Sequence, residues 1–559
     1  MTLEEAPDKT SGVTGSLSRN EWLVLLAIML LAAAIRAVTI SSPRIVWGDE
    51  PFYLWLGQNL WQGGGYSIFG EYAGVHFPPL FPALAGGLAP LTGGLYNASN
   101  LLYIICGALL ILPLYGIARR LHGIQAARVT GLFAAMLPAL TVGVLAWGTM
   151  TEPFYLLAIA TAIYGLIWAM EQGSMGGYLL MAASLGLAYL TRTEAMVFAL
   201  LAFLLLAVTR IVRKDPVGAV LARTGLSALL FLLIASPYVI YLQRETGRWS
   251  LSGAAGMAYV SMEGLANDDA AAFDQATWQL EPDSDEVYMF APSSEGQGLL
   301  SALLADPARI LRRLWSNSQE LIQLLFSIRL VPVLLAGLAV LGLFGRAWTP
   351  QRFRGELALL ASLASPLSYL PFFITDRYLA GFLIPGLIWA GAGMVVLVAW
   401  LIGTSSNLFR KDLPASWTRL LMALPLLFFL TLMLWQGRQL GTIVTHTHSF
   451  QPGHLDAAAE LRERGAAGDS VVMARYPAIA FHAGTAWIPT PASTWPEVLA
   501  YARDRDADFL VMDAWEAKLR PQLSFLMLPQ EAPPQLRYLT SVGCGPDDVV
   551  IYQFQESSP

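Results

Sequence analysis

The stretch Ala195-Met-Val-Phe-Ala-Leu-Leu-Ala-Phe-Leu-Leu-Leu-Ala-Val-Thr209 contains no charged residue. Similar apolar stretches recur along the chain, and Arg and Lys gather in short clusters between them. The 559 residues are 55% hydrophobic and only 13% charged, whereas an ordinary soluble domain is about 25% charged. Because a bilayer core about 30 Å thick requires roughly 20 apolar residues per helix, the sequence predicts a polytopic α-helical membrane protein.

About eleven transmembrane helices fit these apolar stretches. We place them at residues 21–40, 97–118, 128–147, 153–171, 178–192, 194–209, 224–242, 325–345, 355–374, 378–402 and 418–436. The two short segments that flank Arg192 are expected to form a bent hairpin. The first segment lacks a strongly basic leader and a small-residue cleavage site, so we interpret it as a retained helix rather than a signal peptide.

Basic residues in four connections between these helices predict the orientation. They are Arg119, Arg120 and Arg128; Arg210, Arg213, Lys214 and Arg223; Arg346, Arg352 and Arg354; and Arg410, Lys411 and Arg419. All four connections fall on one side, which the positive-inside rule makes cytoplasmic. We therefore expect a multi-pass protein of the plasma or inner membrane with a cytoplasmic N-terminal tail, residues 1–20. The outer side receives loops 41–96 and 243–320.

After the transmembrane domain, residues 21–437, the sequence changes character. Charged residues return, and short β-prone runs alternate with helix-like segments such as Trp495–Arg503. The β-prone runs are Val471–Ala474, Phe509–Met512 and Val549–Phe554. This pattern predicts a small extracytoplasmic α/β domain at residues 438–559. The chain has no basic footprint, which argues against a nucleic-acid partner, and Cys106 and Cys544 are not expected to pair.

Two adjacent carboxylates, Asp49 and Glu50, follow the first predicted helix in the segment Trp47-Gly48-Asp49-Glu50-Pro51. They could be solvated loop acids that cap a helix started by Pro51. Alternatively, a carboxylate near a low-dielectric boundary has a raised pKa and can act as a general base toward an acceptor hydroxyl. Local sequence leaves both interpretations open.

The same loop continues with His76-Phe77-Pro78-Pro79-Leu80-Phe81-Pro82. Its prolines restrict the backbone and would hold His76 in a defined place. The segment could be a rigid connector, or His76 could donate a hydrogen bond to a phosphate or carboxylate.

Glu152 opens a predicted helix at the outer face and is followed by Pro153. An ionisable residue at membrane depth is costly and is by default a functional candidate, although an acid at a helix N-terminus is also favoured by the helix dipole. Arg192 and Glu194 in the next hairpin could form a structural ion pair or line a cavity with Glu152.

The segment Asp376-Arg377-Tyr378 begins another helix on the outer side. Arg377 and Tyr378 could be interfacial anchors, but the planar guanidinium of Arg also suits a lipid phosphate. Arg248, in Thr246-Gly247-Arg248-Trp249, adds positive charge to the same face against the positive-inside bias. Binding of an anionic lipid headgroup would explain why Arg377 and Arg248 lie on the outer face.

Together these segments resemble the GT-C class of membrane glycosyltransferases, and look closest to the branch with protein O-mannosyltransferases and the aminoarabinose transferase of lipid A. The pieces that carry the resemblance are Asp49-Glu50, His76–Pro82, Thr151-Glu152-Pro153, Arg192-Thr193-Glu194, Thr246–Trp249 and Arg377-Tyr378. They are spread over residues 20–400, so the resemblance covers the membrane part of the chain and not the tail.

The resemblance implies a polyprenyl-phosphate sugar donor, inversion at the anomeric carbon, and a lipid, glycan or protein acceptor. Asp49 would deprotonate the acceptor, and Glu50 would orient it or shape the pocket. Arg377 with Tyr378, and with Arg248 and His76, would offset charge on the departing phosphate.

No cofactor is required by this chemistry, because phosphate is already a good leaving group. A divalent cation held by Asp49 and Glu152 is left open, but the outer loops near Glu152 contain no Asp-x-Asp pair. The alternative function is a membrane transporter or lipid flippase with a polar central cavity, although the sequence lacks the related halves that many transporters have.

Overall fold

The structure is a computed structural model of the chain. It describes residues 17–40, 45–46, 48–69, 72–143, 150–267, 269–282, 284–291, 304, 306–409, 414–448, 452–543, 545 and 548–555. Several parts of the sequence predictions lie outside these residues. They are Trp47, Cys544, the basic residues Arg410 and Lys411, the end of the predicted helix 128–147, and most of the predicted tail 1–20.

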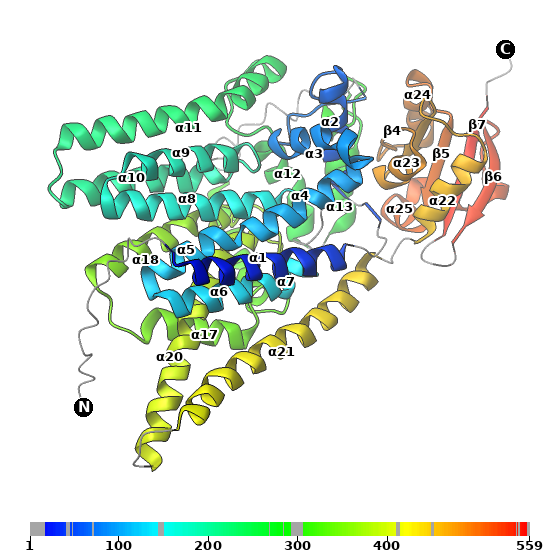
Figure 1. Cartoon of the computed structure of the whole chain (residues 1–559). Coiled ribbons are helices and arrows are strands. Elements are labelled where there is room, and N and C mark those ends of the chain that lie inside the picture. The colour runs from blue at the N-terminus through cyan, green and yellow to red at the C-terminus, as the bar shows by residue number, and fades with distance from the viewer. Residues whose placement is uncertain are drawn as a thin grey trace.

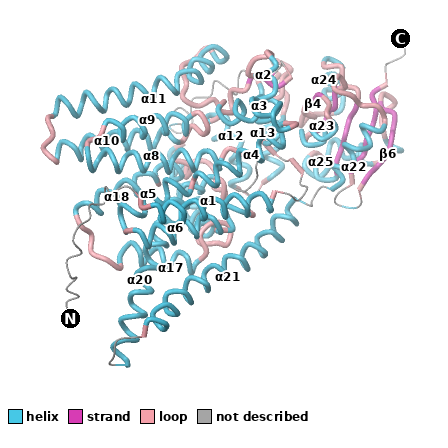
Figure 2. The backbone as a smooth tube through the Cα atoms, in the orientation of Figure 1, coloured by secondary structure: helices cyan, strands magenta, loops and turns pink. Residues whose placement is uncertain are grey.

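Seven helices in the described part of the chain are long and apolar enough to cross a membrane. They are α1 (Arg19–Thr39), the consecutive pair α4 (Leu95–Leu109) and α5 (Ile111–His122), α8 (Glu152–Gln172), α10 (Ala195–Val212), α11 (Val217–Thr246), η3 (Tyr378–Phe382) with α20 (Leu383–Phe409), and α21 (Ala415–His448). Figures 1 and 2 show them as one helical bundle. The prediction of a polytopic α-helical protein is confirmed.

The other four predicted spans fall on shorter helices, so the count of eleven is not confirmed. These helices are α6 (Ile124–Met136) with α7 (Pro138–Thr141), α9 (Met175–Tyr189), α17 (Val333–Phe344), and α18 (Pro350–Ser362) with α19 (Ala364–Leu367). The prediction of one helix over 355–374 is wrong in its second half. Pro366 and Pro371 supply no backbone N–H, and the chain turns between α19 and Tyr378. This turn carries Arg377.

The first outer loop is folded rather than extended. It contains α2 (Glu50–Gln62), a two-stranded antiparallel ribbon of β1 (Ser67–Ile68) and β2 (Tyr72–Ala73), and α3 (Leu80–Thr92). Helices α2 and α3 cross so closely that a Cβ at Gly57 would meet Pro82 O at 2.2 Å, and one at Gly86 would meet Gly57 O at 2.2 Å. Glycine is therefore required at this crossing, which fixes the direction of α2 and of the acids at its start.

The second outer loop contains α12 (Ala255–Ala266), α13 (Ala270–Trp278), the short helix η2 (Tyr288–Phe290) and α16 (Pro307–Leu325). The tail contains α22 (Pro452–Glu463), α23 (Pro477–Ala483), α24 (Trp495–Asp504), α25 (Ala514–Leu519), η4 (Pro521–Met527) and η5 (Pro529–Glu531). Its strands are β3 (Val471–Ala474), β4 (Ala486–Ile488), β5 (Phe509–Asp513), β6 (Leu536–Val542) and β7 (Val549–Phe554).

These five strands form one mixed sheet in the order β4-β3-β5-β7-β6. Strands β4, β3 and β5 are parallel, and β7 pairs antiparallel with both β5 and β6. The three predicted β-prone runs are all strands of this sheet, so the predicted α/β tail is confirmed. Helix α21 continues to His448, beyond the boundary that we placed at residue 438.

The tail domain shares an apolar core with the outer loops. Phe52 of α2 lies 5.3 Å from Trp487 of β4 between ring centroids, and Phe290 lies 6.3 Å from the same tryptophan. The hydroxyls of Tyr72 and Tyr501 are 2.9 Å apart. Such aromatic contacts remove large apolar areas from water, so the tail domain packs on the loops.

A buried ion network joins the same two regions. Asp274 of α13 accepts hydrogen bonds from Arg475 and from Arg520 Nε, at 2.7 Å for the latter. Arg520 also donates to Glu516 at 2.7 Å, and the Asp274 and Arg520 side chains are about 2% and 1% exposed. Removing one partner from such a network leaves a buried charge uncompensated. The network therefore holds the tail domain against the second outer loop.

The end of the bundle that meets the tail domain is opposite the α10–α11 connection, as Figure 1 shows. That connection carries Arg213 and Lys214, and Arg210 and Arg223 lie in the adjoining ends of α10 and α11; we assign all four residues to the cytoplasmic side. The predicted orientation then puts the tail domain and the folded outer loops on the extracytoplasmic side.

This orientation predicts how the exposed residue Gln530 of η5 reacts in whole cells. In a Cys544→Ser background, a Gln530→Cys variant should be labelled by a membrane-impermeant maleimide without permeabilisation, because the tail domain lies outside. The matched control is Lys214→Cys in the α10–α11 connection, which should be labelled only after permeabilisation. The reverse pattern would overturn the orientation.

Candidate active site

Three distant segments of the chain meet at Arg377. This residue precedes η3, and its Nε donates a hydrogen bond to Glu152 Oε1 at 2.8 Å. Its Nη1 donates to Asp49 Oδ2 at 3.3 Å. The backbone N–H of Arg377 is held by Thr375 Oγ1 at 3.1 Å and Asp376 Oδ1 at 3.0 Å. The sequence predicts that Asp49, Glu152 and Arg377 lie on the same outer face, and the structure brings them into one cluster.

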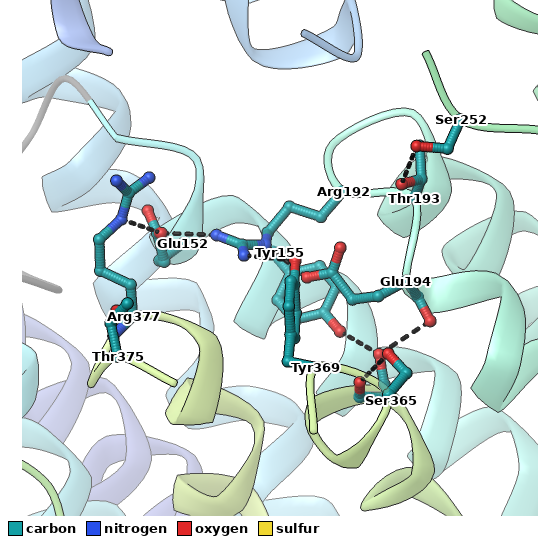
Figure 3. A network of polar contacts seen from close by, with 11 residues as sticks. Glu152, Tyr155, Arg192, Thr193, Glu194, Ser252, Ser365, Tyr369, Thr375 and Arg377 are labelled. Carbon is teal, nitrogen blue, oxygen red and sulfur yellow. Dashed lines mark hydrogen bonds and ion pairs between the residues drawn. The ribbon is translucent and has the colours of Figure 1, made fainter. Parts of the chain in front are cut away.

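Glu152 lies at the start of α8 and is completely buried. Its Oε1 accepts hydrogen bonds both from Arg377 and from Arg192 Nη1, the latter at 2.6 Å. Figure 3 shows the two guanidinium groups approaching this carboxylate from opposite sides. Its Oε2 has no hydrogen-bond partner among the described residues. Glu152 is thus shared by two cations, and each cation has a second acid of its own, Glu194 for Arg192 and Asp49 for Arg377.

Arg192 lies in the turn between α9 and α10 and has a partner for each guanidinium nitrogen. Nε donates to Glu194, Nη1 to Glu152, and Nη2 to the Tyr369 hydroxyl at 2.9 Å. Its guanidinium carbon also lies 5.5 Å from the ring centroid of Tyr378. Because each of its three nitrogens already has a partner and its side chain is only 9% exposed, Arg192 positions Glu152 rather than offering a site to a substrate.

Aromatic rings surround Arg192. Tyr155 and Tyr369 lie 5.7 Å and 5.8 Å from its guanidinium carbon, and Tyr369 stacks on Tyr378 at 4.1 Å with an interplanar angle of 7°. The Tyr155 hydroxyl bonds Ser365 at 2.6 Å, and Ser365 donates to the Glu194 carbonyl at 3.0 Å. Cation–π contacts stabilise a desolvated guanidinium, so these rings keep Arg192 charged and immobile.

Arg377 differs from Arg192 because part of it remains available. Its side chain is 18% exposed, and no described residue accepts a hydrogen bond from Nη2. Figure 3 shows the terminal nitrogens pointing away from Glu152. Burial lowers the pKa of Arg377, but the charges of Glu152 and Asp49 outweigh burial and raise it well above the usual value. Arg377 is therefore a fixed cation whose Nη2 can still donate a hydrogen bond to a ligand.

Asp49 is the accessible acid of the cluster. Its side chain is 43% exposed, compared with 1% for Glu152 and 10% for Glu194. It occupies the N-cap position of α2 but makes no side-chain capping bond, so the interpretation as a capping acid loses support. Glu50 is completely buried, which fits a role in shaping the pocket rather than contacting a substrate.

Two residues predicted to contact a phosphate do not join the cluster. His76 Nε2 lies 2.7 Å from the Met289 carbonyl, which ties the first outer loop to the second. Burial lowers the pKa of His76, so its ring is neutral and poorly suited to hold an anion. Arg248 is exposed beyond the end of α11. For both residues a phosphate contact stays a prediction that this cluster does not support.

Sequence reasoning predicts Tyr378 but misses Tyr155, Tyr369 and Ser365. The predicted apolar spans 153–171 and 355–374 include Tyr155, Ser365 and Tyr369, and tyrosine near a membrane interface is typical of anchoring residues. The only signal was the occurrence of Ser365, Pro366 and Ser368 inside a supposed transmembrane helix. Within the described part of the chain, no group of three or more His, Cys, Asp or Glu residues could hold a metal ion.

Comparisons with known proteins agree on the fold. A model of the dolichyl-phosphate-mannose-protein mannosyltransferase family matches residues 76–241. ArnT from Cupriavidus metallidurans bound to undecaprenyl phosphate covers 97% of this chain and 99% of its own, with 14% identity and a TM-score of 0.59. The chain therefore has the fold of this structure, which is the fold of the GT-C class.

A second GT-C structure is the archaeal oligosaccharyltransferase AglB from Archaeoglobus fulgidus in complex with an inhibitory peptide and a dolichol-phosphate. It has 12% identity and a TM-score of 0.53, and the match covers 89% of this chain and 69% of that protein. No curated protein sequence matches the chain significantly. At these identities the GT-C comparison establishes the fold, and the chemistry depends on the site itself.

The cluster predicts that replacing Glu152 lowers thermal stability much more than replacing Asp49 does. Glu152→Gln should destabilise the detergent-solubilised chain by about 3–5 kcal/mol, because two buried guanidinium groups lose their shared counter-charge. Asp49→Asn, the matched control, should change stability by less than about 1 kcal/mol because its ion pair is half exposed. Equal melting temperatures for the two variants would contradict the assigned roles.

Proposed function

We propose that the chain is a glycosyltransferase that moves a sugar from a polyprenyl-phosphate donor to an acceptor hydroxyl, with inversion, on the extracytoplasmic face. The observation that carries this proposal is the pairing of Asp49 with Arg377. An accessible carboxylate and a guanidinium with a free donor lie 3.3 Å apart, beside a buried acid that fixes the guanidinium. A general base and a phosphate-binding cation are the two groups that such a transfer requires.

The donor phosphate would compete with Asp49 for Arg377. Phosphate oxygens and guanidinium nitrogens form strong bidentate hydrogen bonds, and Nη1 and Nη2 are the nitrogens that face away from Glu152. When the phosphate takes these donors, the Asp49 carboxylate loses its ion pair and becomes available to the acceptor. Donor binding would thus activate the base, which would limit wasteful proton transfer before the donor is in place.

In the transfer step, Asp49 accepts the proton of the acceptor hydroxyl while the acceptor oxygen attacks the anomeric carbon. The bond between that carbon and the phosphate oxygen breaks, and its electron pair stays on the phosphate. Arg377 offsets the added negative charge, and such preorganised stabilisation is often the largest catalytic term. Attack from the face opposite the departing phosphate inverts the anomeric centre.

Support for the lipid donor comes from the GT-C structures, since ArnT was solved with undecaprenyl phosphate and AglB with a dolichol-phosphate. Arg377 suits the same kind of group, because its Nη2 has no described acceptor and its Nη1 pairs only with the accessible acid Asp49. A transporter or flippase would also need a polar cavity, but it would not need an accessible carboxylate paired to a phosphate-binding cation. The proposed chemistry uses no cofactor.

The role of Asp49 is tested by Asp49→Asn in a transfer assay with a polyprenyl-phosphate sugar. We expect turnover to fall by about 10²–10⁴-fold, the usual contribution of a general base, while the melting temperature stays unchanged. The matched control is Asp306→Asn, another half-exposed N-cap acid in an outer loop, which should retain turnover. Near-normal turnover by Asp49→Asn would refute the assignment.

The role of Arg377 is tested by Arg377→Ala in the same assay. Losing the preorganised cation should lower kcat/KM by about 10²–10³-fold, and Arg377→Lys should recover only part of this loss because Lys lacks the planar fork. Arg248→Ala serves as the comparison, and we expect it to have a far smaller effect. If Arg248→Ala lost as much activity as Arg377→Ala, the assignment of the phosphate site to Arg377 alone would be wrong, and the site would include the end of α11.

A further inference from the structure

A hollow lies apart from the ion cluster, between the C-terminal half of α2, the start of α4 and the tail domain. Its volume is about 550 Å³, within the range of roughly 300–1,000 Å³ found for small-molecule sites. Residues of all three regions line it, among them Gln58 and Gln62 of α2, Asn97 of α4, and Phe481 and Thr485 of the tail. The hollow thus exists only where the tail domain packs on the first outer loop.

One wall of the hollow is aromatic. Trp55 lies 4.8 Å from Phe69 and 5.8 Å from Phe481 between ring centroids. Trp55 is held from behind by Trp487 at 6.4 Å, and Phe69 is 38% exposed at the edge of the hollow. Fixed aromatic rings with an open edge offer an apolar surface at little cost in side-chain entropy.

The other walls offer amides. Gln58 and Gln62 are one helical turn apart on the same face of α2, and both are exposed. Neither makes a hydrogen bond to any described residue. Asn97 uses its Nδ2 to bond the Thr92 carbonyl at 3.1 Å, which leaves its Oδ1 open. Helix α4 starts at this hollow, and the first N–H groups of a helix have no acceptor within it.

Charge is absent from the lining. None of the described residues around the hollow is acidic, basic or a histidine, so an ionic ligand would lose its hydration without gaining a counter-charge. Gly468 and Gly484 form part of the tail side, where the lack of side chains allows a ligand to approach the backbone closely. Uncharged amide donors and acceptors facing an aromatic wall match a ligand with many hydroxyls and apolar C–H faces.

We propose that this hollow binds a neutral saccharide. Gln58 and Gln62 would bond its hydroxyls, and Trp55, Phe69 and Phe481 would contact its C–H faces. Gln58 follows Asp49 by nine residues along α2, which corresponds to roughly 13 Å at the rise of an α-helix. If the proposed transfer reaction holds, the saccharide is a distal unit of the acceptor, and α2 sets its distance from the base. Saccharide binding itself does not depend on that reaction.

The test is binding of neutral disaccharides to the purified full-length chain by saturation-transfer NMR and calorimetry. The probes are mannobiose, maltose and chitobiose, with digalacturonate as the charged counterpart. At least one neutral probe should bind, and the Gln58→Ala/Gln62→Ala double variant should weaken it by about tenfold or more. Gln530→Ala, an exposed glutamine of η5 outside the hollow, is the matched control and should bind as the unmodified chain does.

A second variant fills the hollow instead of removing its polar groups. A Cβ at Gly468 would meet only the Gly484 carbonyl, at 3.8 Å, so Gly468→Phe should fold normally and abolish binding. Unchanged binding in both variants, no binding of any neutral probe, or tighter binding of digalacturonate would overturn the proposal. A chain that binds these probes but transfers no sugar would contradict the proposed function and leave the saccharide site standing.

Discussion

Oε1 of Glu152 accepts hydrogen bonds from two guanidinium groups, and the arrangement of the site depends on that one atom. Through it, the start of α8, the turn between α9 and α10, and the turn before η3 are held together. Charge-assisted hydrogen bonds are strong in a low-dielectric environment. Because Glu152 is completely buried, water does not compete for these bonds. Loss of the carboxylate would leave two buried cations facing each other.

The guanidinium groups of Arg192 and Arg377 have different roles in the site. Each guanidinium nitrogen of Arg192 has a partner, in Glu194, Glu152 and Tyr369, and tyrosine rings enclose the group, so its function is to fix the carboxylate. Arg377 is fixed by the same carboxylate but keeps donors that point toward an accessible acid, Asp49. Asp49 in turn lies at the start of α2, whose direction is set by the glycine crossing with α3 and by the aromatic contacts with the tail domain. The folded outer loops and the tail domain therefore position one half of the site, and the membrane helices position the other half.

Much of this could be predicted because charged residues are conspicuous in an apolar chain. Asp49, Glu152, Arg192 and Arg377 each stood out, as an ionisable group near or within apolar sequence is costly unless it has a partner. The tail strands were also predictable from short β-prone runs. The pairing of Arg377 with Asp49 and Glu152 was not predictable, since it joins residues more than 200 positions apart.

Three other features of the site and the fold could not be predicted from the sequence, each for a physical reason. Tyrosines that enclose a buried cation have the same sequence signature as tyrosines that anchor a helix at a lipid interface. The break after Ser362 depends on prolines within a stretch that is otherwise apolar, and hydropathy alone does not register it. His76 was predicted in a phosphate role because imidazole changes charge readily, yet its place is set by a carbonyl of the second outer loop, which no local pattern reveals.

The most direct measurement of the central claim is an experimental structure of the chain with a polyprenyl phosphate bound. The account predicts that phosphate oxygens lie within hydrogen-bond distance of the terminal nitrogens of Arg377, that Arg377 Nε still contacts Glu152, and that Asp49 has moved off its ion pair. A phosphate bound away from Arg377, or an Asp49–Arg377 pair that remains intact beside a bound phosphate, would contradict it.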